Sequence, residues 1–155
     1  SAGDYACVVL PGMMIPFPAL FDRKLIDFLV SLKGKDLLIA AISAGPMLLA
    51  KARLLEDVHF ISGIWEEICQ NLDFIPHQNI LHRPLVKEKN IITAVGFAFR
   101  EFAEAVIRTL GIDPCEPGLF RGIYKEFTEQ EMTHFMGEEN FQHFLQEYQQ
   151  WQQRQ

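Results

Sequence analysis

The segment Leu37–Leu48, with the sequence LLIAAISAGPML, decides the fold of this 155-residue chain. It begins with a continuous run of six apolar residues, which is typical of a strand buried on both faces. Ser43 follows, and the small residues Ala44 and Gly45 lead directly to Pro46, which favours the first turn of a helix. The segment therefore predicts a buried strand that turns sharply into a helix at Ser43.

Apolar runs and amphipathic segments alternate on both sides of this turn. The pattern predicts strands over 5–10, 36–42 and 58–62, helices over 19–32, 64–72 and 99–110, and a hairpin with arms at 79–86 and 91–96. Strands that alternate with helices indicate an α/β domain. We predict a flavodoxin-like, mostly parallel sheet with helices on both faces, formed by residues 1–112.

Residues 113–155 differ from the rest and predict a C-terminal helical extension packed on the α/β domain. Thr128 and Glu131 have the spacing of a capping box, and residues 138–153 carry aromatic side chains at helical spacing. This last helix either docks on its own domain or binds a partner, such as a second copy of the chain.

Charge and cysteine content exclude several functions. The chain has 14 basic and 20 acidic residues, a net charge of −6, which argues against nucleic acid or an anionic membrane as partner. No apolar run reaches the length of about 18 residues that spans a bilayer. Cys7, Cys69 and Cys115 lie far apart and lack the spacing of metal ligands. We expect a reduced, cytoplasmic protein without a metal or another cofactor.

Two interpretations of Ser43 remain open at this point. The pattern A-x-S-x-G between a strand and a helix is that of a nucleophile elbow, in which small neighbours make room for one projecting side chain. Serine is equally a favoured N-cap residue, and in that case Ser43 only begins the following helix.

Four stretches together resemble a known family. They are YACVVLPG (5–12), GKDLLIAAISAGPMLLAKARLL (34–55), NIITA (90–94) and FREFAEAVIRTLGI (99–112). In combination they resemble the ThiJ/PfpI family of the class I glutamine-amidotransferase-like superfamily. The resemblance covers about residues 4–112. It implies a fold that opens with a strand–helix–strand unit, and we expect this unit to be lacking before Asp4. Three explanations are open. The chain is a fragment, another chain supplies the missing unit, or dimerisation covers the exposed part of the sheet.

The resemblance also implies how the site is built. The family has a reactive cysteine where this chain has Ser43, and the amides of Gly12 and Ala44 match the positions that face an oxyanion. The family's histidine falls at Gly63, and its glutamate lies in the leading unit. This sequence thus departs from the family pattern at positions 43 and 63, and we expect the glutamate of the leading unit to be lacking as well.

Exchanging a thiol for an alcohol changes the chemistry of the turn. A helix N-terminus contributes about 1 kcal/mol, which populates the thiolate of a cysteine with a pKa near 8.5 but barely affects an alcohol. A serine nucleophile therefore needs a general base within hydrogen-bond reach. The five histidines, which are His59, His77, His82, His134 and His143, include no obvious candidate.

Ligands of open α/β sheets bind beyond the carboxyl ends of the strands. That rule, the turn and the resemblance give the candidate binding residues Gly12, Met13, Ala44, Gly45, Gly63, Trp65, Glu66, Glu67 and Arg100. The charged ones are either ligands for a small polar molecule or ordinary surface charges. We predict a binding or oligomeric module that lacks the family's cysteine chemistry. The alternative is a hydrolase or lyase that acts on a small carbonyl or amide substrate through Ser43.

Overall fold

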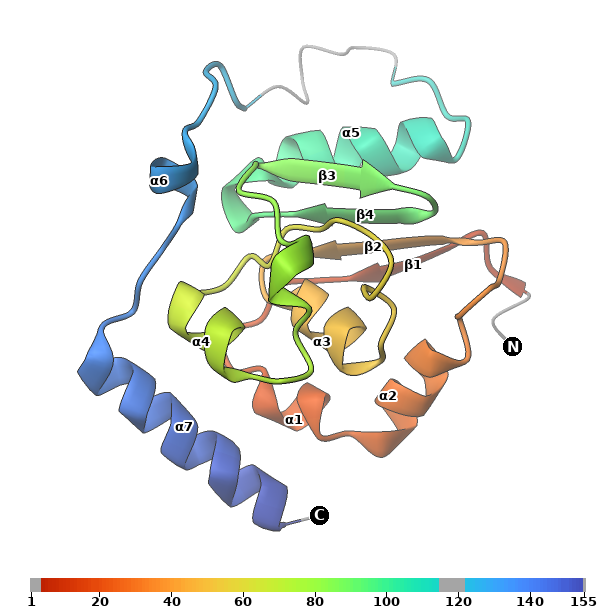
Figure 1. The fold of residues 1–155 in the computed structure, drawn as a ribbon. Coiled ribbons are helices and arrows are strands. Elements are labelled where there is room, and N and C mark those ends of the chain that lie inside the picture. The colour runs from red at the N-terminus through yellow and green to blue at the C-terminus, as the bar shows by residue number, and fades with distance from the viewer. Residues whose placement is uncertain (1–3, 115–121, 155) are drawn as a thin grey trace.

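The computed structural model describes residues 4–114 and 122–154, and these form a four-stranded sheet with the order β1-β2-β4-β3 (Figure 1). The strands are β1 (Cys7–Leu10), β2 (Leu38–Ile42), β3 (Leu85–Glu88) and β4 (Ile91–Ala94). β2 pairs in parallel with β1 and β4, and β3 pairs with β4 as an antiparallel hairpin. The predicted mostly parallel α/β sheet is therefore confirmed.

Helices cover both faces of the sheet. They are α1 (Phe17–Leu20), α2 (Arg23–Val30), α3 (Gly45–Lys51), α4 (Glu66–Asn71), α5 (Phe99–Thr109), α6 (Glu129–Met132) and α7 (Glu138–Gln153). In Figure 1, α5 lies on one side of the sheet, and α1, α2, α3 and α4 lie on the other. This arrangement follows from β2, where Ile39 and Ala41 pack with the α3 side while Leu38 and Ala40 pack with α5.

One predicted helix is divided in two. The apolar spacing predicts one helix over 19–32, but α1 ends at Leu20 and α2 begins at Arg23. The reason is Asp22, which has an extended backbone and accepts a hydrogen bond from the Leu25 amide at 3.1 Å. Asp22 is thus the N-cap of α2, a role that periodicity alone does not reveal.

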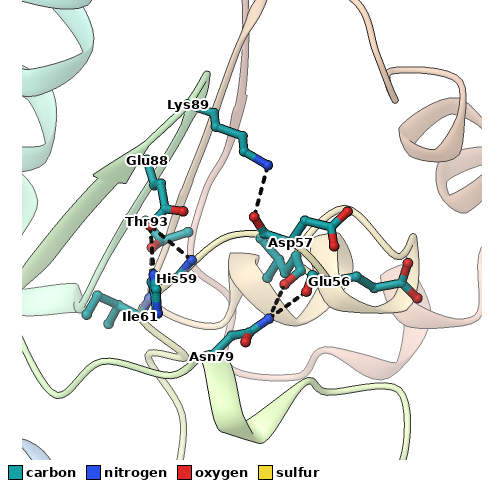
Figure 2. Close-up of polar contacts among 9 residues, drawn as sticks. Glu56, Asp57, His59, Ile61, Asn79, Glu88, Lys89 and Thr93 are labelled. Atoms are coloured by element: carbon teal, nitrogen blue, oxygen red, sulfur yellow. Dashed lines mark hydrogen bonds and ion pairs between the residues drawn. The ribbon is translucent and has the colours of Figure 1, made fainter.

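The predicted strand over 58–62 is wrong, because this segment forms only an isolated bridge between Phe60 and Ile80. Both edges of β2 and both edges of β4 are already paired, so no position in this part of the sheet is open to it. The segment is held by polar contacts instead (Figure 2). The Ile61 amide donates to Thr93 Oγ1 at 2.8 Å, and Lys89 Nζ donates to the Asp57 carbonyl at 3.0 Å.

The C-terminal segment packs back on the α/β domain through aromatic rings. The ring centroids of Phe17 and Phe144 lie 5.1 Å apart, and those of Phe21 and Tyr148 lie 5.4 Å apart. The capping box predicted at Thr128 is present at the start of α6. In the described ranges, no helix is both long enough and apolar enough to cross a membrane.

We expect Thr93→Val to destabilise the fold by about 1–3 kcal/mol, because it leaves the buried Ile61 amide without an acceptor. Thr93→Ser keeps the hydroxyl and serves as the control. The free energy of unfolding in urea and the exchange rate of the Ile61 amide measure the effect. Equal protection of that amide in both variants would show that the hydrogen bond does not hold the segment.

Candidate functional site

Ser43 lies in a strained turn between β2 and α3. Its φ angle of 58° places it in the left-handed region, which is uncommon for a residue with a side chain. Its amide still donates to the Ala94 carbonyl at 2.9 Å, so the strand pairing reaches this residue. Ala44 is the N-cap of α3, without a side-chain hydrogen bond. The interpretation of Ser43 as a helix cap is therefore wrong.

Two glycines allow the surrounding backbone to approach this turn. A Cβ atom on Gly12, after β1, would lie 2.7 Å from Ser43 Cβ, and a Cβ on Gly63 would overlap the Ser43 carbonyl group. Gly63 also has a φ angle of 64°, which favours glycine. The structure thus brings together Gly12, Ser43 and Gly63, which the sequence analysis places in the same site.

A cavity of about 650 Å³ lies beside this turn, and we call it the α7 cavity because α7 forms one of its walls. Its lining residues are Met13, Met14, Ile15, Pro16, Phe17, Ala44, Met47, Ile64, Trp65, Ile68, Phe135, Met136, Asn140, His143, Phe144 and Glu147. Most of these side chains are apolar. Met13, Ala44 and Trp65 are the predicted site residues that line it.

A second cavity of about 120 Å³ lies along Gly63 and Gly96, which both approach Ser43. Its wall contains His82, Arg83 and His134. The Ser43 hydroxyl lies close to this wall, since a Cβ atom on Gly96 would lie 3.6 Å from Ser43 Oγ.

Glu66 is engaged by side chains from neighbouring segments. Its carboxylate lies 2.7 Å from His77 Nε2 and 3.8 Å from His82 Nε2, and it accepts a hydrogen bond from Gln70 at 2.8 Å. Burial by itself would raise the pKa of Glu66, but the hydrogen bonds with His77 and Gln70 bring it below its ordinary value. Glu66 therefore belongs to a polar cluster and does not line the α7 cavity.

Glu67 anchors the start of α7. Its two carboxylate oxygens accept hydrogen bonds from the amides of Met136, at 3.1 Å, and Gly137, at 3.0 Å. Burial would raise the pKa of Glu67, whereas these backbone hydrogen bonds lower it, and the net pKa lies below the ordinary value. Glu67 thus positions a wall of the α7 cavity from outside it.

The remaining predicted groups lie apart from the two cavities. Arg100 lies over the ring of Phe99, with Cζ 5.3 Å from the ring centroid, and it lines neither cavity. Burial raises the pKa of the Cys69 thiol to about 11, which keeps that thiol protonated at neutral pH. Cys115 lies outside the described residues. No cluster of His, Cys, Asp and Glu suited to a metal ion is found within the described ranges.

Sequence reasoning missed the contribution of the C-terminal segment to this site. Phe135 and Met136 precede α7, and Asn140, Phe144 and Glu147 come from α7 itself. The aromatic stripe of residues 138–153 was the available signal, but it gives no information on which part of the domain the helix contacts.

A strained strand–turn–helix at the carboxyl edge of a mostly parallel sheet, with helices on both faces, defines an α/β protein of the flavodoxin-like class. The sequence profile of the DJ-1/PfpI family matches residues 1–109, and the chain therefore belongs to the DJ-1/PfpI family. A search of curated protein sequences found no match.

Several solved structures have the same fold as this chain. A two-domain protein from Anabaena variabilis, with DJ-1/ThiJ/PfpI-like and ferritin-like domains, is 24% identical, with a TM-score of 0.63 over 72% of this chain and 32% of that one. A DJ-1 superfamily protein from Agrobacterium tumefaciens is 21% identical, with a TM-score of 0.60, and the match covers 75% of this chain and 62% of that one. A ThiJ/PfpI family protein from Bacillus anthracis is 21% identical, with a TM-score of 0.53, and the match covers 70% of this chain and 51% of that one. The chain thus spans about a third to two thirds of the length of these proteins.

We expect Gly63→Ala to lower the free energy of unfolding by about 3 kcal/mol or more, because the new methyl group overlaps the Ser43 backbone and the φ angle is unfavourable. Gly111→Ala is the matched control, since Gly111 has a φ angle of 79° but open space around it, and should cost about 1 kcal/mol. Urea denaturation compares the two. Equal costs would mean that the close approach to Ser43 adds nothing.

We expect Glu67→Gln to flatten the dependence of stability on pH. The pKa of Glu67 is lower in the folded chain than in the unfolded chain, so its contribution is complete above the unfolded value of about 4.3 and is lost as the pH falls through the folded value. The wild type should therefore lose more stability between pH 5 and pH 3 than the variant does. Urea denaturation across this range measures it, with Glu126→Gln, an exposed site, as the control. Parallel curves for wild type and Glu67→Gln would contradict the anchoring role.

Proposed function

We propose that this chain is a small-molecule-binding module of the DJ-1/PfpI family that holds an apolar ligand in the α7 cavity. The observation that carries the proposal is the cavity itself, whose volume of about 650 Å³ lies in the range of small-molecule sites. Its wall combines the loop after β1, the start of α3, α4 and α7. A site assembled from segments so distant in sequence favours ligand binding over a purely oligomeric role.

The proposal includes the loss of the family's cysteine chemistry at the turn. Serine stands where the resemblance places the reactive cysteine, and its alcohol gains little acidity from its surroundings. Gly63 stands where the resemblance places the histidine, and the contact with Ser43 leaves no room there for a side chain. These features support binding without nucleophilic catalysis by Ser43.

One observation favours the alternative of a Ser43-dependent hydrolase or lyase. A φ angle of 58° is the kind of strain that elbow nucleophiles show, and it costs about 1–3 kcal/mol. The turn thus has the backbone geometry of a nucleophile elbow.

The cavity is tested with N-phenyl-1-naphthylamine, a neutral apolar dye that becomes fluorescent in apolar sites. We expect saturable binding to the wild type and about tenfold weaker binding to Trp65→Ala, because the indole supplies a large part of the apolar wall. Phe99→Ala is the control, since Phe99 is 56% exposed on α5 and lines neither cavity. Circular dichroism verifies that both variants fold.

Two outcomes would overturn the proposal. Equal affinity of wild type and Trp65→Ala for the dye would place binding outside the α7 cavity. Covalent labelling of Ser43 by a fluorophosphonate, located by peptide mass spectrometry, would support the hydrolase instead.

A further inference from the structure

The wall of the α7 cavity is rich in aromatic rings and thioethers, and the inference drawn from it rests on the proposed function. Phe17 and Phe144 form a tilted pair with centroids 5.1 Å apart and are buried, with exposures of 3% and 8%. Trp65 and Phe135 are more exposed, at 41% and 67%. Four methionines, Met13, Met14, Met47 and Met136, complete the apolar part. Such a wall suits hydrocarbon and contains electron-rich aromatic rings and polarisable sulfur.

The charge of the wall is negative. Glu147 on α7 is the only acidic residue among the lining residues, and these include neither lysine nor arginine. His143, one helical turn before it, is the only other titratable lining group, with Nε2 3.7 Å from Glu147 Oε1. The Asn140 amide nitrogen donates to the Met136 carbonyl at 2.8 Å. Among the described residues, a ligand in this cavity therefore meets one carboxylate and no permanent positive charge.

We propose that the α7 cavity binds lipophilic monocations, which combine a hydrocarbon body with one ammonium group. The body replaces water along the apolar wall. The ammonium group is attracted by the aromatic faces and by the Glu147 carboxylate, and the net charge of −6 on the chain favours its approach. An anionic amphiphile of the same length would bring its carboxylate towards the Glu147 carboxylate, and neither lysine nor arginine is among the lining residues to offset the repulsion.

The test compares three ligands with the same ten-carbon chain at pH 8, where histidine side chains are ordinarily neutral. They are n-decyltrimethylammonium and n-decanoate, each below its micelle concentration, and n-decanol below its solubility limit. The chain has two tryptophans, so Trp151→Phe leaves Trp65 as the sole indole reporter of the cavity. We expect the cation to bind most tightly and the anion least. Shortening the cation by one methylene should weaken binding about fourfold.

Glu147→Gln should reduce the preference for the cation over decanol by about two- to fivefold, because the carboxylate is partly exposed. Glu139→Gln removes the same charge from an exposed position of α7 outside the cavity and should leave the preference unchanged. Decanoate binding as tightly as the cation, or an unchanged preference in Glu147→Gln, would overturn the ligand class while the cavity stands. If neither these ligands nor N-phenyl-1-naphthylamine binds, the proposed function fails as well.

Discussion

The approach of the Gly63 backbone to the Ser43 carbonyl group is the contact on which the site depends. It leaves no space for a side chain at Gly63, and it fixes the segment from α3 to α4 against the end of β2. That segment forms no sheet strand, so side chains hold it in place: Thr93 binds the Ile61 amide, and Asn79 binds the carbonyls of Leu55 and Glu56 (Figure 2). The position of Gly63 therefore depends on hydrogen bonds from side chains that lie far from it in sequence, at Thr93 and Asn79.

The position of α4 follows from the same contact, because this helix begins three residues after Gly63. α4 carries Glu66 and Glu67 in its first turn, and both residues hold the C-terminal segment. The Glu66 amide donates to the His134 carbonyl at 2.8 Å, and the Glu67 carboxylate binds the two amides that precede α7. The wall of the α7 cavity is thus placed through a series of contacts that starts at the turn after β2.

Continuous apolar runs and helical spacing explain why much of the fold was predictable, although of β1 and β2 only β2 is buried on both faces, since Val9 of the edge strand β1 is 51% exposed. Strands β1 and β2 occur as continuous apolar runs, and α7 occupies the predicted range 138–153. The sequence does not show that Asp22 divides a helix or that β2 and β4 leave no edge for residues 58–62. For the site, small residues around Ser43 indicated the close approach. Glu66 and Glu67 contact partners up to 70 residues away, and their charge alone could not reveal these contacts.

The strain at Ser43 has a structural explanation that requires no catalysis. A left-handed residue directly after β2 turns the chain within two residues, so that α3 begins at Gly45 beneath the end of β1. Gly45 approaches the Leu10 carbonyl so closely that a Cβ there would lie 3.0 Å from that oxygen. A wider turn would separate these elements and enlarge the space beside Ala44, which lines the α7 cavity. The strain is therefore offset by close packing at the base of an apolar cavity, which is a property that a binding site needs as much as an enzyme does.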